Sequence, residues 1–155
     1  KTCNSTNYFL QAELISLCKT LLIIKFNSME AKDITGRVEI ELLVNTFYEK
    51  VNKDKGLSPM FAEVHWETHL PVMYDFWENV MFHTGNYSGN PMVKHHMVHQ
   101  KHPLTKQHFE MWLLLFEETV DDFFSGPNAI LIKERARSIA IIMEMKIIVP
   151  ERNVL

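Results

Sequence analysis

Five of the eight histidines in this sequence lie between His95 and His108. His95 and His99 are four residues apart, so on a helix their imidazoles share one face. Three interpretations follow: a solvated polar helix with incidental histidines, a non-haem metal site formed by the His95–His102 cluster, and a single axial ligand for a haem iron. A structural zinc site usually takes four ligands, often including cysteine. Because Cys3 and Cys18 lie far from the cluster, a dedicated zinc site is the least favoured.

A single axial ligand makes the smallest demand on the sequence. It needs one neutral imidazole on a short helix that faces a large apolar slot. The sequence contains ten Phe, three Trp and nine Met, which are enough to line such a slot.

Three further polar side chains lie within apolar helical stripes: Tyr48, His69 and Trp112. Tyr48 follows Val44 by four residues, and His69 precedes Met73 by four. Each of the three, taken alone, is more often a core residue that finds a backbone acceptor. Taken together, a buried O–H, a ring N–H and an indole N–H could converge on one small ligand.

Helices must position these side chains, because apolar residues recur at spacings of three and four and no alternating strand pattern occurs. Asp33 or Thr35 is predicted to cap a first helix that ends near Val51. A short turn follows at residues 57–61. The second helix ends near Phe82, and Pro71 predicts that it either begins near His69 or is kinked there.

The second half of the sequence continues this all-α pattern. Residues 83–91 form a predicted loop, and residues 92–100 form a short helix that carries His95. Thr105 is predicted to cap a long helix to Phe124. Gly126 and Pro127 then separate it from a last helix, whose apolar stripe ends at Ile147. The expected fold is therefore four substantial helices and one short one.

Composition predicts one globular domain, since 46% of the residues are hydrophobic and 23% are charged. The formal net charge of −3 provides no basic footprint for nucleic acid. No uncharged apolar run of roughly 18 residues occurs, so no membrane-spanning helix is expected. Both cysteines precede residue 20, which fits a reducing cytoplasm. Because Met29 opens a more regular pattern, we interpret residues 29–155 as the domain. Residues 1–28 are then an N-terminal extension, either a disordered or non-native segment or an extra packed helix.

Several segments, in this order and spacing, resemble the group III (P-type) truncated haemoglobins of the globin superfamily. They are LVNTFYEKV around Tyr48, WETHLPVMYDFWENVMF around His69, YSGNPMVKHH around His95 and HFEMWLLLFEETVD around Trp112. KERARSIAIIMEMKI resembles the final helix of that family. The resemblance covers roughly residues 33–147.

The resemblance implies a two-over-two helical sandwich around haem b. It places the proximal iron ligand on His95, and it places the distal ligand-binding residues on Tyr48, His69 and Trp112. Besides His95, the residues expected to contact the cofactor are Phe47, Phe61, Met73, Phe76 and Trp77.

The function implied is binding of dioxygen, carbon monoxide or nitric oxide at the haem iron. Oxygen handling, nitric oxide detoxification and peroxidase-like chemistry are all open within that family. Detoxification would make the protein an enzyme and would require a reductase as a partner. The competing hypothesis is the helical bundle with a non-haem metal in the His95–His102 cluster. A ferritin-like di-iron site is disfavoured, because inward-facing Glu-x-x-His pairs do not occur.

Overall fold

The computed structural model describes residues 31–148. The predicted extension, residues 1–28, lies outside the described residues. The elements run in the order α2 (Arg37–Lys53), η1 (Ser58–Phe61), α3 (Trp66–Phe82), α4 (Pro91–Lys101), α5 (Lys106–Phe123) and α6 (Pro127–Ile148). Within this described part, the only β-type pairing is an isolated parallel bridge between Lys32 and Phe124. The predicted all-α class is therefore confirmed.

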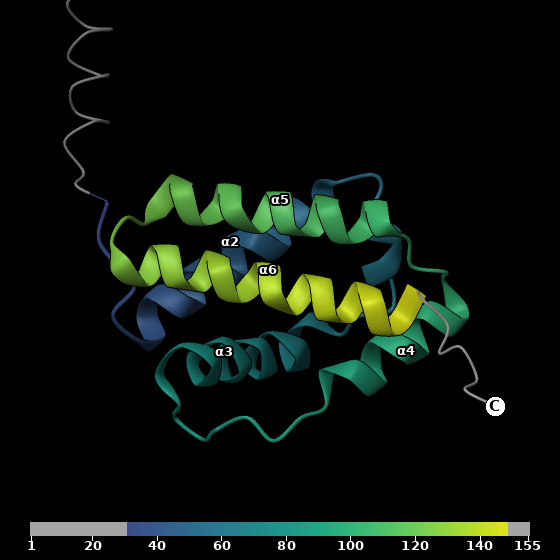
Figure 1. Cartoon of the computed structure of the whole chain (residues 1–155), viewed down its shortest axis with the longest axis horizontal. Helices are drawn as coiled ribbons and strands as arrows, with labels where there is room; N and C mark the ends of the chain where they lie inside the picture. The colour runs from purple at the N-terminus through teal and green to yellow at the C-terminus, as the bar shows by residue number, and fades with distance from the viewer. Residues whose placement is uncertain (1–30, 149–155) are drawn as a thin grey trace, which may run out of the picture. The chain divides into compact units, whose positions relative to one another are not determined.

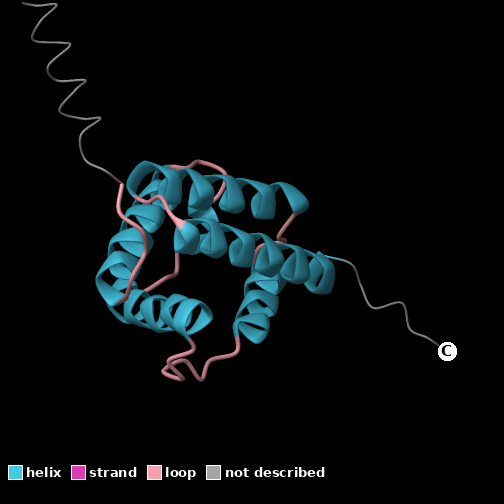
Figure 2. Cartoon of the chain, turned by 60° about the vertical axis from the view of Figure 1, so that its left-hand side comes forward, coloured by secondary structure: helices cyan, strands magenta, loops and turns pink. Residues whose placement is uncertain are grey.

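The helices form two packed pairs. α2 packs on α3 and on α5, and α5 runs antiparallel beside α6 (Figure 1). The short helix α4 packs on α6 and is joined to α3 by the loop at residues 83–90, which Figure 2 shows at the edge of the bundle. This is the two-over-two arrangement that the resemblance implies. It leaves α3 and α4 on the same side of α6.

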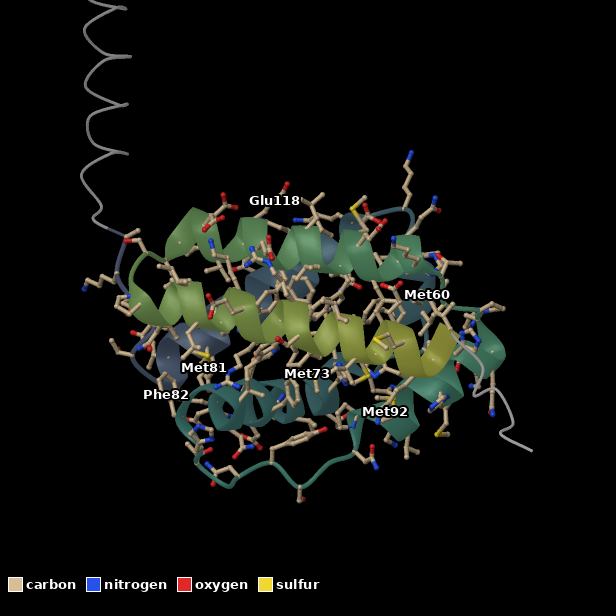
Figure 3. All side chains as sticks on the ribbon, viewed as in Figure 1. Met60, Met73, Met81, Phe82, Met92 and Glu118 are labelled. Carbon is tan, nitrogen blue, oxygen red and sulfur yellow. The ribbon has the colours of Figure 1, made fainter. Side chains whose placement is uncertain are left out.

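The core follows the predicted apolar stripes. On α2 the buried residues are Ile40, Leu43, Val44, Phe47, Tyr48 and Val51. On α6 they are Ala129, Ile132, Ala136, Ala140, Met143 and Ile147. A second, smaller cluster gathers Leu104, Met143 and Ile147, with Met60 and Met92 packed against it. Figure 3 shows Met92 on α4, the helix that carries His95.

The predicted cap of the first helix is wrong. Gly36 occupies the N-cap position of α2, and no side chain caps that end. The Thr35 hydroxyl instead bonds the Glu39 carboxylate at 3.2 Å. Asp33 caps a different helix, because its carboxylate accepts hydrogen bonds from the N–H groups that begin α6. The capping rule failed here because the Asp33 carboxylate is bonded to N–H groups that are distant in sequence.

Of the two alternatives predicted for the second helix, the start near His69 is wrong. α3 begins at Trp66, and Pro71 lies inside it. A proline removes one backbone hydrogen bond and costs about 3 kcal/mol in a helix interior. Packing of the helix offsets that cost, since Trp77 and Met81 are buried and Leu70 and Met73 pack against the core. The predicted end at Phe82 is confirmed.

The ends of the next two helices are set by side chains. Asn90 caps α4 by accepting the Val93 N–H at 3.2 Å, and Pro91, predicted as loop, is the first residue of that helix. The predicted Thr105 cap of α5 is confirmed. Thr105 accepts the His108 N–H, and His108 in return accepts the Thr105 N–H through Nδ1 at 3.1 Å.

Candidate functional site

His95 lies on α4 with one ring nitrogen already fixed. Its Nδ1 is 2.7 Å from the carbonyl oxygen of Pro91, one helical turn earlier. A carbonyl oxygen can only accept, so Nδ1 must carry the proton. The neutral imidazole therefore keeps its lone pair on Nε2, which is the form that binds a metal ion.

Two other histidines between residues 95 and 108 have hydrogen-bond partners of their own. His99 Nδ1 accepts the Leu104 N–H at 3.0 Å, just beyond the end of α4. His108 belongs to the capping box of α5. Between residues 31 and 148, no three His, Cys, Asp or Glu side chains are placed to hold a metal ion. The structure thus gives no support to the non-haem metal hypothesis.

An apolar groove lies beside His95. It has a volume of about 290 Å³ and is lined by Phe76, Val80, Pro91, Met92, Ile139, Ile142 and Met143, from α3, α4 and α6. Met92 is three residues before His95, so the two share a face of α4. No residue of α4 is buried. The face of α4 that carries His95 therefore borders an apolar space.

The second group of predicted site residues surrounds Tyr48 on α2. The Tyr48 side chain is buried, and its ring contacts those of Phe61, Trp66 and His69 at centroid distances of 5.7, 5.1 and 5.7 Å. Phe61 and Trp66 stack at 6.1 Å. The structure thus brings Tyr48 and His69 together, as the sequence predicts.

Burial controls the protonation of both polar groups. It raises the pKa of Tyr48, so the phenol stays protonated and can donate a hydrogen bond. Burial also lowers the pKa of His69. His69 is therefore neutral at neutral pH.

Trp112 belongs to a neighbouring aromatic cluster on α5. Its indole stacks on Trp77 at 6.4 Å and on Phe116 at 5.4 Å, and it meets the edge of Phe47 at 5.4 Å. Phe47 also contacts Tyr48 at 4.9 Å. Trp112 is thus connected to the Tyr48 group through Phe47.

The predicted cofactor-contacting residues divide in the same way. Phe76 lines the groove, and Trp77, Phe47 and Phe61 belong to the aromatic clusters described above. Met73 is half-buried and packs against the core. Sequence reasoning missed Met92, Ile139 and Met143 in the groove, and Trp66 beside Tyr48. Ile139, Met143 and Trp66 lie in apolar helical stripes of the sequence, but spacing alone does not distinguish a core residue from one that lines a ligand pocket.

Comparison with known proteins identifies the family. Residues 32–147 match the bacterial-like globin family. The chain is also similar to the group 3 truncated haemoglobin of Campylobacter jejuni, with 33% identity over 122 residues that cover 75% of this chain and 89% of that protein. The chain belongs to the bacterial-like globins, as a truncated haemoglobin of group III.

A solved structure supports the same assignment for this globin. The crystal structure of a group III truncated haemoglobin from Campylobacter jejuni has a TM-score of 0.66 and 31% identity, covering 74% of this chain and 92% of that one. A partial match to synaptotagmin-10 of Rattus norvegicus, 32% identical over 105 residues, covers 19% of that protein. That match covers too little of synaptotagmin-10 to bear on this chain.

The cofactor of this globin is haem with its iron, and the residues present suit that group. His95 offers a free Nε2, and the groove beside it is lined by apolar side chains that can cover a porphyrin. As a globin the chain binds small diatomic ligands. None of its described helices is long and apolar enough to cross a membrane.

Proposed function

We propose that this globin binds dioxygen, carbon monoxide or nitric oxide at a haem iron ligated by His95, with Tyr48, His69 and Trp112 on the ligand-binding side. The observation that carries the proposal is the hydrogen bond from His95 Nδ1 to the Pro91 carbonyl at 2.7 Å. That bond fixes the tautomer and the ring orientation of a ligand histidine.

Haem iron, when bound, supplies the site to which the diatomic ligand attaches. The chain contributes orientation and polarity. Pro91 holds the His95 ring through its carbonyl oxygen, and the bond to that acceptor makes Nε2 a better electron donor. Because Pro91 is also the first residue of α4 and lines the groove, the start of α4 positions the histidine relative to the apolar space.

The opposite side of the site contributes hydrogen-bond donors in an apolar setting. Tyr48 is surrounded by aromatic rings and keeps its proton. A protonated hydroxyl can donate a hydrogen bond, so a ligand that accepts one in this apolar setting is favoured. His69 is half-buried, so it lies between this interior and solvent. Trp112 can only donate, through its indole N–H.

The proposal is tested by substitution of His95, and the same substitution of the neighbouring residue His96 is the control. His95→Ala should weaken haem binding in a haemin titration or remove the proximal-histidine absorbance spectrum, and added imidazole should restore the spectrum. His96→Ala should behave like the parent, because the His96 side chain makes no hydrogen bond within the described residues and is exposed. Loss of the signature in His96→Ala alone would move the ligand by one residue.

The sequence also predicts nitric oxide or peroxide detoxification, a reductase partner and a cytoplasmic location, and these three stay predictions. Oxygen binding has the more direct support, because a protonated Tyr48 in an apolar cluster favours a ligand that carries partial negative charge.

A further inference from the structure

The outward face of α4 exposes two large apolar side chains. Val93 is 51% exposed and Met97 is 53% exposed. They are four residues apart and therefore adjacent on the helix surface. Lys94 and Lys101 lie three residues before and four residues after Met97, so they border the same pair. We call these four residues, together with His96, the basic α4 surface.

The charge of this surface differs from that of the rest of the chain. The whole sequence has a formal net charge of −3. Every other described α-helix contains acidic residues, whereas α4 contains two lysines, three histidines and no Asp or Glu. Lys101 pairs with Glu63 at 2.6 Å. The side chains of Lys94 and His96 make no ion pair or hydrogen bond within residues 31–148, and both residues are exposed.

The basic α4 surface lies directly behind the proposed iron ligand. Lys94 and His96 flank His95 in sequence, and helical periodicity of 3.6 residues per turn places Met97 roughly opposite His95 around the helix axis. A molecule seated on Met97 is therefore about one helix diameter, ~10–12 Å, from the side of α4 that carries the imidazole.

We propose that the basic α4 surface is the docking site of an acidic electron-donor protein whose redox group lies near its own surface. The inference rests on the proposed ligation of iron by His95. The reduced donor, a flavin hydroquinone, gives one electron to ferric iron, which becomes ferrous. The flavin becomes the semiquinone and releases one proton to water. Ferrous iron is the form that binds dioxygen.

The composition of the surface fits such a partner. Electron-transfer complexes are small and transient, with buried areas at the low end of protein interfaces. Opposite charges at the rim steer encounter and raise the association rate. Two exposed apolar residues bordered by lysines match the small buried area of such a complex. They are too few for the broad apolar face with which an interfacial helix enters a lipid bilayer.

The probe for this proposal is an acidic flavodoxin reduced to the hydroquinone. Stopped-flow mixing with the ferric haem-loaded globin under carbon monoxide gives the second-order rate of reduction, and calorimetry of the oxidised pair gives binding. The rate should fall as salt is added. Lys94→Glu should lower it about tenfold at low ionic strength, and Met97→Ser should weaken binding. Lys32→Glu is the matched control, because Lys32 is exposed and lies at the opposite end of α6, beside Phe124. It should stay within twofold of the parent.

The controls separate this proposal from the ligation of iron by His95. A variant with an altered absorbance spectrum reports on the haem site, whereas a changed rate with an unchanged spectrum reports on docking. If Lys94→Glu loses haem, Lys101→Gln and Met97→Ser decide the matter by the same two measurements. Equal rates in Lys94→Glu and Lys32→Glu would overturn the proposal. The proposal would also be overturned if flavodoxin bound the Lys94 and Met97 variants as tightly as the parent in calorimetry. It would be overturned as well if the globin did not bind flavodoxin but sedimented with phosphatidylglycerol vesicles in a manner that depends on Lys94.

Discussion

Asp33 Oδ1 accepts a hydrogen bond from the backbone N–H of Ala129 at 2.8 Å, across 96 residues of sequence. Asp33 Oδ2 accepts the Asn128 N–H at 3.0 Å, and the Asn128 side chain donates to the Ile34 carbonyl at 2.7 Å. The segment before α2 is thereby attached to the start of α6. Since α6 supplies Ile139 and Met143 to the groove beside His95, this attachment helps to place one wall of the site.

Removal of this cap should destabilise the fold. Asp33→Ala leaves the first N–H groups of α6 without their acceptor, and a lost N-cap costs about 0.5–2 kcal/mol of unfolding free energy. Asp33→Asn keeps an acceptor oxygen but loses the charge that favours a helix N-terminus, so it should cost less. Urea unfolding of the three proteins at neutral pH measures both differences. An Asp33→Ala protein as stable as the parent would show that the carboxylate contributes nothing.

The contribution of the Asp33 charge should depend on pH. Burial raises the pKa of this carboxyl, but hydrogen bonds from the N–H groups of Asn128, Ala129 and Ile34 lower it, and the net result lies below the ordinary value of 3.8. A lowered folded-state pKa means stability that is present above the unfolded pKa and lost as the pH falls through the folded one. The difference between the parent and Asp33→Asn should therefore be full at neutral pH and shrink below about pH 4.

Gly126 should tolerate no side chain. Its φ is 134°, and a Cβ there would lie 2.5 Å from Asp33 Cγ, so an alanine would be strained and would displace the cap. We expect Gly126→Ala to destabilise the protein by about 1–3 kcal/mol. Gly36→Ala is the matched control, because Gly36 has extended backbone with nothing within 4 Å of the added Cβ. Thermal unfolding compares the two, and equal midpoints would contradict the argument.

Asp33 and Thr105 show where local sequence rules suffice and where they do not. Thr105 caps the helix that follows it, as predicted, because its partner His108 is three residues away. Asp33 matched the same local pattern and yet caps a helix that begins 94 residues further along. Capping rules consider only neighbouring residues, so they could not predict this partner. The predicted start near His69 failed for a related reason, since packing of α3 overcomes the penalty of Pro71 and the helix begins at Trp66.

The candidate site divides in the same manner. The apolar stripes placed Tyr48 and His69 on the inner faces of two helices, and the structure brings those rings to 5.7 Å. Periodicity did not assign Ile139 and Met143 to the groove, because a residue that faces a cofactor and one that faces the core occupy the same helical stripe. The relative position of α4 decides between them, and it is a tertiary property.

A chain that begins at Met29 should fold and bind haem. The family match covers residues 32–147, and the Asp33 cap and all the site residues lie after Met29. Circular dichroism and a haemin titration of the shortened chain check this prediction against the full chain. Loss of solubility or of haem binding would mean that residues 1–28 belong to the domain.

His69→Leu should change ligand entry more than ligand retention. His69 is half-buried and contacts Tyr48 and Trp66, so it lies between the aromatic cluster and solvent. Leucine removes the polar ring but keeps apolar bulk. Flash photolysis of the carbon monoxide complex should show an altered association rate, while the dissociation rate changes less. A larger effect on dissociation of dioxygen than that of Tyr48→Phe would make His69 the main donor instead.

Tyr48→Phe should release dioxygen about tenfold faster. Iron-bound dioxygen carries partial negative charge, whereas bound carbon monoxide is much less polar, so a buried O–H donor stabilises dioxygen selectively. A net hydrogen bond contributes about 0.5–1.5 kcal/mol, and more when the acceptor carries charge. About 1.4 kcal/mol corresponds to a tenfold change in an equilibrium constant. Phenylalanine keeps the ring contacts of Tyr48 with Phe61 and Trp66, so packing changes little.

Comparison with Trp112→Phe shows whether Tyr48 is the principal donor. Trp112 reaches the Tyr48 group through Phe47 and stacks on Trp77 and Phe116, so much of its contribution is packing. Trp112→Phe should also speed dioxygen dissociation, but by less than Tyr48→Phe does. Stopped-flow dissociation of dioxygen and of carbon monoxide from both variants gives the four rates required. The selective effect on dioxygen is the decisive one, because a mere packing defect would change both ligands alike. An unchanged dioxygen off-rate in Tyr48→Phe would mean that Tyr48 serves packing only.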